Sequence, residues 1–331
     1  MQFHSDNAAQ VHPRVGEAMR DADALNMGYD GGALTARLDE AMSALFGADC
    51  AVLWAATGTA ANCLALAAMV RLEGGAICHR EAHIEVDEGG APGFLPHGAK
   101  LMLADVEHAK LAPDAVRALI DPIRDDVYQV QPRALSVTQA SEYGCAYRPQ
   151  ESRALSGLCR ERGLGFHIDG ARFANAVAFV GCHPRAACEG ADALSFGMVK
   201  NGAMNAEAIA FFDPGKADRI HHLRKRAGHL QSKGRFLAAR ILAMIDGDLR
   251  LDNARKANAA ALQLACNAPD RLLRPVEANE LFLRLSDAER AALREKGFGF
   301  HDWGHDAAWI VTAWDTREDH VEAFAAALAA L

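Results

Sequence analysis

Short apolar segments alternate with longer helical segments along the first two thirds of the chain. Between Leu34 and Phe212, apolar runs bounded by Gly, Asp and other polar residues are typical of buried strands. The segments between them are rich in Ala and Arg, and Leu34, Leu38 and Leu45 recur at helical spacing before Gly47 ends that segment. The strands predicted in this way are Cys50–Trp54, Gly75–Cys78, Ala134–Thr138, Phe166–Asp169, Ala193–Phe196 and Ala208–Phe212. Such alternation predicts a largely parallel sheet with helices on both faces.

The pattern changes beyond the basic segment His221–His229. The elements expected there are a long helical stretch from Phe236 to about Ala268, strands at Glu280–Leu285 and around Trp309–Trp314, and a closing helix from Glu318. This mixture is typical of a separate α+β domain. We therefore expect an α/β protein with a mostly parallel sheet in a large domain, residues 1–240, which includes an N-terminal arm. A smaller α+β C-terminal domain would comprise residues 241–331.

The composition excludes several classes of protein. The chain has 331 residues, 50% of them hydrophobic, which is enough for a large core. A formal charge of −8 without a basic stripe argues against nucleic acid or anionic membranes as partners. No apolar run approaches the length of a membrane span, and the N-terminus lacks the features of a signal peptide. The eight cysteines form no Cys-x-x-Cys motif, so we expect reduced thiols in a cytoplasmic protein.

Two residues follow predicted strands, at the positions where open α/β sheets place their chemistry. Asp169 ends the run Gly165–Asp169, and Lys200 comes shortly after Ala193–Phe196. A pyridoxal phosphate (PLP) enzyme needs a lysine amine to bond to the cofactor aldehyde and a carboxylate to keep the pyridine nitrogen protonated. Asp169 and Lys200 are candidates for these two groups. The alternative for Lys200 is an ordinary exposed lysine in a loop.

Thr57-Gly58-Thr59 stands between a predicted strand and an apolar helix that continues through Val70. Glycine permits close approach, the hydroxyls donate hydrogen bonds, and a helix N-terminus carries free amides and positive potential. Gly58 and Thr59 are therefore candidates to bind a phosphate group. A tight turn with Thr59 as the N-cap of the helix is the alternative. No dinucleotide-binding or P-loop motif is present.

His83 and Arg172 are two further candidates. His83 follows a predicted strand and could stack on a flat cofactor ring and transfer a proton, although it could also be merely one of 14 histidines, partly exposed on an acidic helix. Its spacing from nearby carboxylates fits no zinc site, so no metal is expected. Arg172 could bind a substrate carboxylate with two hydrogen bonds. The alternative is a local ion pair between Arg172 and Asp169.

Taken together, the motifs resemble those of the low-specificity L-threonine aldolases, PLP enzymes of fold type I in the aspartate aminotransferase superfamily. The resemblance covers essentially the whole chain. The matching runs are Ser5–Asn7, Thr57–Asn62, Ala82–Pro92, Thr138–Gly144, His167–Phe173, Ser195–Gly202, Ser232–Leu237, Pro275–Asn279 and Trp314–Thr316.

The resemblance implies a role for each candidate residue. Lys200 would hold PLP covalently, Asp169 would pair with the ring nitrogen, and His83 would stack over the ring and move protons. Gly58 and Thr59 would bind the phosphate group. Arg172 would bind the amino-acid carboxylate close to the cofactor, with Ser5 nearby. The family works as homodimers or homotetramers, in which Tyr29 and a basic residue of Arg224–Arg226 would reach the site of a neighbouring subunit.

Three positions depart from the family pattern. Family members usually carry an arginine, which helps to clamp the substrate carboxylate, where this chain has Trp309. A second active-site histidine is often found where this chain has Val127-Tyr128. Met198-Val199 replaces the usual small Gly-Thr pair before the lysine. These departures suggest a changed substrate preference or reaction.

The expected activity is cleavage of L-β-hydroxy-α-amino acids, threonine or allo-threonine-like, to glycine and an aldehyde. A carbon–carbon lyase of this kind acts on a small amino-acid substrate. The alternatives are β-elimination or another PLP reaction on the same scaffold, because a fold does not determine a reaction. A PLP-binding protein with little turnover is a further alternative.

Overall fold

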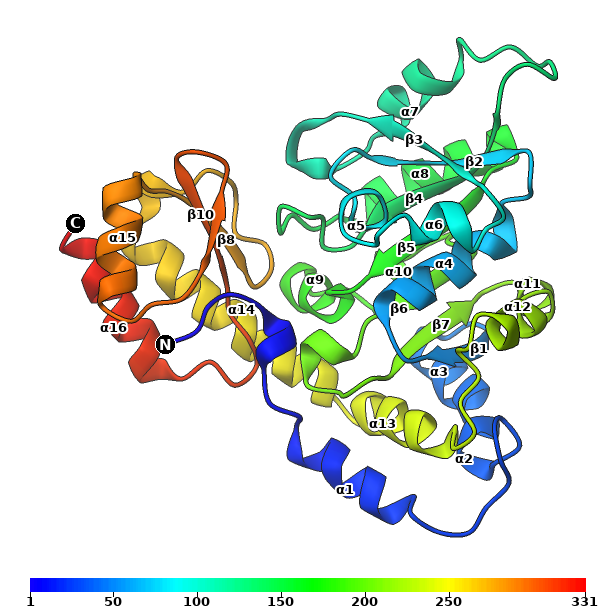
Figure 1. Ribbon diagram of the computed structural model, residues 1–331, viewed down its shortest axis with the longest axis horizontal. Coiled ribbons are helices and arrows are strands. Elements are labelled where there is room, and N and C mark those ends of the chain that lie inside the picture. The colour runs from blue at the N-terminus through cyan, green and yellow to red at the C-terminus, as the bar shows by residue number, and fades with distance from the viewer.

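The computed structural model describes all residues 1–331 and contains the predicted α/β fold (Figure 1). A seven-stranded sheet has the order β1-β7-β6-β5-β4-β2-β3, in which β7 is antiparallel to both of its neighbours, β1 and β6, and all other pairs are parallel. The strands are β1 Ala51–Ala55, β2 Gly74–His79, β3 Lys100–Ala104, β4 Gln131–Thr138, β5 Gly165–Gly170, β6 Ala193–Phe196 and β7 Glu207–Phe211. Six of them are the predicted strands, with small differences at their ends.

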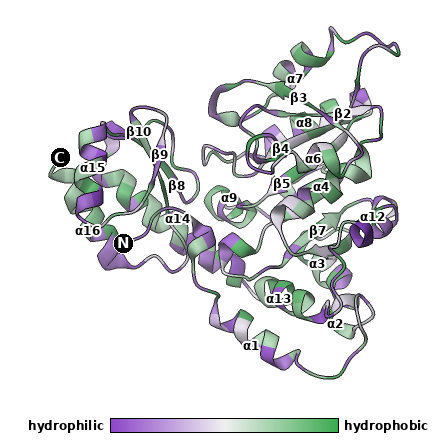
Figure 2. Cartoon of the chain, viewed as in Figure 1, coloured by the Kyte–Doolittle hydropathy of each residue, from purple (hydrophilic) through white to green (hydrophobic).

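Helices cover both faces of this sheet, because successive strand residues alternate between two apolar clusters. Val52 and Trp54 pack on one face, whereas Leu53 and Ala55 pack on the other. The first face is covered mainly by α3 Leu38–Phe46, α7 Pro113–Ile120, α8 Pro149–Arg162, α9 Phe173–Val180 and α13 Arg235–Ile245. Helix α4, Gly58–Met69, lies on the opposite face and is buried on nearly all sides. In Figure 2 the strands are largely green, whereas the outer helix α12, His221–Arg226, is purple.

The remaining helical segments of the large sheet region are short. They are η1 Asp6–Ala8, α1 Pro13–Asp21, α2 Ala33–Ala36, α5 His83–Val86, α6 Ala91–Phe94, η2 Glu107–Ala109, α10 Pro184–Ala187, η3 Val199–Asn201, α11 Pro214–Asp218 and α12 His221–Arg226.

A smaller three-stranded antiparallel sheet follows, with the order β8-β10-β9. Its elements are α14 Leu249–Asn267, η4 Pro269–Arg271, β8 Glu280–Arg284, α15 Asp287–Glu295, β9 His301–Trp303, β10 Ala307–Val311 and α16 Glu318–Ala329. The N-terminal residues join this region, since Phe3 N donates to Gly299 O at 2.7 Å and Val311 N donates to Phe3 O at 2.9 Å. Both chain termini therefore lie beside the smaller sheet (Figure 1).

Two features differ from the sequence prediction. Strands β3 and β9 were not predicted, because each presents polar or exposed residues at an edge of its sheet. The expected single helix from Phe236 to Ala268 is two helices, α13 and α14, which are separated at Gly247 with a left-handed φ of 58°. No helix is both long and apolar enough to cross a membrane.

Candidate active site

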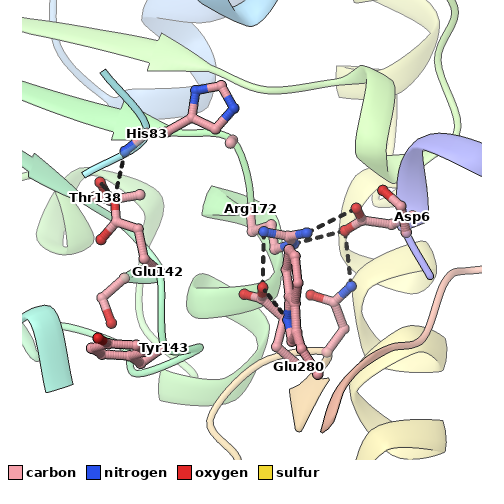
Figure 3. Close-up of polar contacts among 12 residues, drawn as sticks. Asp6, His83, Thr138, Glu142, Tyr143, Arg172 and Glu280 are labelled. Atoms are coloured by element: carbon pink, nitrogen blue, oxygen red, sulfur yellow. Dashed lines mark hydrogen bonds and ion pairs between the residues drawn. The ribbon is translucent and has the colours of Figure 1, made fainter. Parts of the chain in front are cut away.

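A cavity of about 500 Å³ lies where the carboxyl ends of the parallel strands meet. Six predicted site residues line it, although they come from segments far apart in the sequence: Gly58, Thr59, His83, Asp169, Arg172 and Lys200. Several buried carboxylates share the same walls. Figure 3 shows His83 and Glu142 on one side, and Arg172 with Asp6 and Glu280 on the other.

Asp169 is the last but one residue of β5 and only 4% exposed. Its Oδ1 accepts a hydrogen bond from Ala171 N at 3.0 Å, and its Oδ2 accepts one from Asn62 Nδ2 at 2.8 Å. The predicted alternative, an ion pair with Arg172, is absent from the structure. A buried carboxylate held only by neutral donors can still pair with a cation. Asp169 thus fits a protonated pyridine nitrogen.

His83 is connected to Asp169 through two residues that the sequence did not single out. Its Nδ1 donates to Glu88 Oε1 at 2.9 Å, and Asn62 Nδ2 bridges Glu88 and Asp169 at 2.8 Å each. The hydrogen bond to Glu88 raises the pKa of His83 above its ordinary value, although burial opposes this effect. Asn62 lies one helical turn after Gly58, a spacing that could have identified it as a site residue.

Lys200 lies in η3, directly after the end of β6. Its Nζ has no hydrogen-bond or ion-pair partner within the chain, and the side chain reaches the cavity. Glu207, a buried residue that also lines the cavity, accepts a hydrogen bond from Met198 N. Burial raises the pKa of Glu207 to about 7. Lys200 is therefore free to react with a group that enters the cavity.

The N-terminus of α4 opens onto the same cavity. Thr57 is its N-cap, because Thr57 Oγ1 accepts a hydrogen bond from Ala60 N at 3.2 Å. The alternative that Thr59 is the cap is therefore wrong. Thr59 lines the cavity, and a Cβ atom on Gly58 would meet nothing within 4 Å. This open helix N-terminus fits an anionic group such as phosphate.

Arg172, expected to be free for a substrate carboxylate, already has two carboxylate partners. Its Nε and Nη2 donate to Asp6 Oδ2 and Oδ1 at 2.8 and 3.0 Å, and its Nη1 lies 3.1 Å from Glu280 Oε1 (Figure 3). Neither Asp6 nor Glu280 was predicted as a site residue. They come from opposite ends of the chain, so no local pattern connects them with Arg172.

Glu142 is a further residue that sequence reasoning did not assign to the site. Its Oε1 accepts hydrogen bonds from Thr138 Oγ1 and from His83 N, the latter at 3.3 Å. Glu142 lines the cavity and is partly buried. Burial raises the pKa of Glu142 to about 7. A carboxyl group of this kind can exchange a proton near neutral pH.

Ser5 and Tyr29, the other two predicted site residues, lie outside the cavity lining. Ser5 caps η1 by accepting a hydrogen bond from Asn7 N at 3.1 Å. Tyr29 is 46% exposed and packs against the Lys225 ammonium group. Tyr128, at one of the departures from the family pattern, is 86% exposed. Trp309, at another, lines the cavity and donates from Nε1 to Glu280 Oε1 at 3.2 Å.

Comparisons with known proteins agree with this geometry. The model of the beta-eliminating lyase family matches residues 2–288. The low specificity L-threonine aldolase of Pseudomonas aeruginosa is 42% identical, covering 98% of this chain and 96% of its own. That of a Pseudomonas species is 40% identical, covering 100% and 97%.

Among solved structures, a threonine aldolase of Leishmania major has a TM-score of 0.93 at 24% identity and covers 99% of this chain and 98% of its own. A serine palmitoyltransferase of S. paucimobilis with bound PLP has a TM-score of 0.73 at 12% identity, with coverages of 100% and 86%. At these identities the likeness shows the fold, which is fold type I as predicted.

The chain therefore belongs to the beta-eliminating lyase family, and it is a lyase with the fold of PLP enzymes. The curated relatives that match over its full length are low specificity L-threonine aldolases, so the resemblance found in the sequence is confirmed.

Proposed function

We propose that the cavity binds PLP and that the enzyme cleaves L-β-hydroxy-α-amino acids, threonine or allo-threonine-like, to glycine and an aldehyde. The observation that carries this proposal is the placement of Asp169 and Lys200. Asp169 lies near the carboxyl end of β5 and Lys200 follows the adjacent strand β6, and both line one cavity together with the N-terminus of α4. The identity to threonine aldolases over the whole chain supports the same reaction.

The residues present fit the cofactor. Asp169 would pair with the pyridine nitrogen, Gly58 and Thr59 would hold the phosphate group, and the free Nζ of Lys200 would bond to the aldehyde. Bound there, PLP supplies a ring that accepts the electrons released when the Cα–Cβ bond breaks. Asn62 keeps the Asp169 carboxylate oriented for this role.

His83 is the proposed acceptor of the β-hydroxyl proton. Glu88 holds Nδ1, so Nε2 is the nitrogen available for proton transfer. The same hydrogen bond makes the imidazole a stronger base, since it raises the pKa of His83. Glu142, which accepts from the His83 backbone, is a second group that could exchange the proton on the same side of the cavity.

A neighbouring subunit is proposed to complete the phosphate site in a homodimer or homotetramer. Arg172 and Lys200 are the only Arg or Lys residues in the cavity lining, and both have other proposed roles. Arg224 is buried in an ion pair with Asp30 at 2.7 Å, whereas Lys225 is exposed beside Tyr29. Lys225 and Tyr29 are thus the proposed contribution to the neighbour's cavity.

Two further proposals follow from the sequence. The enzyme is proposed to be cytoplasmic. The division into a large domain, residues 1–240, and a small domain, residues 241–331, is supported by the separate sheets.

Product analysis tests the reaction. With L-threonine or L-allo-threonine, the holoenzyme is expected to release glycine and acetaldehyde in equal amounts. A 2-oxo acid and ammonia would instead show β-elimination, and no product would favour a binding protein. Lys200→Ala should abolish release. Borohydride reduction of the holoenzyme should place a pyridoxyl label on the Lys200 peptide, and its absence there would overturn the proposal.

A further inference from the structure

Arg172 is the one cation in ion-pair contact with two buried carboxylates. One guanidinium group faces the carboxylates of Asp6 and Glu280, whose side chains are 1% and 0% exposed. Asn279 Nδ2 also donates to Asp6 at 3.0 Å, which fixes this carboxylate in its two-pronged contact with Arg172. A substrate carboxylate that approached Arg172 would be a third anion in a desolvated cluster, and such a cluster is strongly disfavoured.

Trp309 supplies no charge to balance the cluster. It lies diagonally across the antiparallel pair β8–β10 from Glu280, on the same face of the sheet. Its indole N–H donates to Glu280 Oε1, but an indole is a neutral donor. An arginine at this position would provide both the hydrogen bond and the missing positive charge. The negative charge of the incoming carboxylate must therefore be compensated in another way when an amino acid binds.

Glu280 cannot easily move away. It begins β8, and a Cβ atom added to Gly144 would lie 3.1 Å from Glu280 Cβ, so the adjacent backbone is closely packed. Its Oε1 is held by Arg172 and Trp309, whereas its Oε2 is buried and has no hydrogen-bond partner. Protonation at Oε2 would thus remove one negative charge without breaking any existing contact.

We propose that Glu280 is a specificity-determining residue: the substrate carboxylate binds at Arg172 only when Glu280 takes up a proton. The inference rests on the proposed function, because it assigns Arg172 to the amino-acid carboxylate. It deepens that function by making recognition of the substrate depend on pH.

The charged groups around Glu280 agree with this assignment. Arg172, Asp6 and Lys200 interact with it electrostatically, and so does the buried Cys145 thiol. Burial raises the pKa of Glu280 in spite of Arg172. Burial also acts on Asp6, but Arg172 and Lys200 hold the pKa of Asp6 below its ordinary value. Glu280 is therefore the carboxylate of the pair that accepts the proton.

The test compares glycine with methylamine as ligands of the holoenzyme, because the two differ only in the carboxylate. Calorimetric titrations at pH 8 in buffers of different ionisation enthalpy give both the affinity and the number of protons taken up. Glu280→Gln should bind glycine about tenfold more tightly than wild type, with about one proton fewer taken up per site. Its affinity for methylamine should be unchanged.

Two further variants distinguish the proposed role of Glu280 from general effects on folding. The outcomes also distinguish failure of this inference from failure of the proposed reaction. Glu277→Gln, in the segment before β8 and outside the cavity lining, should behave as wild type. Trp309→Arg, which keeps Glu280, should also tighten glycine binding and reduce proton uptake. Equal glycine affinity and equal proton uptake in wild type and Glu280→Gln would overturn the inference. Failure of the proposed function would appear differently, as normal glycine binding by wild type without aldehyde release from threonine.

Discussion

At the scale of single residues, the partner of each buried carboxylate decides its chemistry. Asp169 is held by amide donors, Glu88 by the His83 imidazole, and Glu142 by a hydroxyl and a backbone N–H. Glu280 has one oxygen with no partner. Groups of one chemical type thus have different hydrogen-bond partners in and around one cavity.

The contact between Glu88 and His83 gives a prediction about pH dependence. Glu88→Gln keeps an acceptor for His83 Nδ1 but replaces the charge-assisted hydrogen bond that raises the pKa of His83 with a weaker one to a neutral amide oxygen. If deprotonated His83 accepts the β-hydroxyl proton, the acid limb of the kcat/KM profile should move to lower pH by about one unit. Aldehyde release from L-threonine across pH 5–9 measures this shift. Glu85→Gln, at an exposed position of α5, is the matched control, and an unmoved acid limb in Glu88→Gln would contradict the assignment.

At the scale of elements, the sequence predicted strand β5, which carries Asp169, and strand β6, which precedes Lys200, because continuous apolar runs are typical of buried parallel strands. It also predicted the open N-terminus of α4 from Thr57-Gly58-Thr59. Edge strand β3 was not predicted, since two of its five residues are exposed and its apolar run is short. The break at Gly247 was missed because the flanking helices share a continuous helical periodicity.

Helix α4 gives a prediction in which two neighbouring threonines have different roles. Thr57→Ala removes the N-cap and should lower the free energy of unfolding of the apoprotein by about 1 kcal/mol. Thr59→Ala leaves the cap intact, so its unfolding should change little, but loss of one hydroxyl donor to phosphate should weaken PLP binding by about tenfold. Urea unfolding of the apoproteins and PLP titration measure the two effects. If Thr59→Ala retained full PLP affinity, Thr59 would not be a phosphate ligand.

At the scale of the whole molecule, the N-terminal arm contributes residues to a site that is formed mainly by the central part of the chain. Phe3 is buried among the apolar residues of the smaller sheet and stacks on Phe324 with ring centroids 5.0 Å apart. This contact anchors the N-terminal arm three residues before Asp6, which is itself 166 residues from Arg172 in sequence. Local patterns predict helices and strands, whereas contacts over such separations depend on the complete fold. The family resemblance could place Arg172 in the site, but only the structure shows its carboxylate partners.

Buried carboxyl groups also make the stability of the whole molecule depend on pH. Glu207 has a pKa raised to about 7 by burial, against 4.5 as its ordinary value, so the folded apoprotein binds more protons than the unfolded chain between these values. The unfolding free energy of the wild-type apoprotein should therefore fall as pH rises from 4.5 to 7. Above pH 7 this loss of stability should stay constant. Glu207→Gln can still accept from Met198 N but cannot ionise. Relative to wild type, its unfolding free energy should increase by roughly 3 kcal/mol between pH 4.5 and pH 7.5.

Urea unfolding of the apoproteins at fixed protein concentration, repeated at each pH, measures this difference. Glu322→Gln, at an exposed position of α16, should follow the wild-type pH dependence and serves as the control. Because wild type and Glu207→Gln are both uncharged at this position in acid, their relative stability at pH 4.5 sets the baseline for the comparison. A constant difference across the whole range would mean that Glu207 is ionised at every pH tested. The Glu207 carboxylate would then be a permanent negative charge close to Lys200, and the charge balance of the cavity would have to be assigned anew.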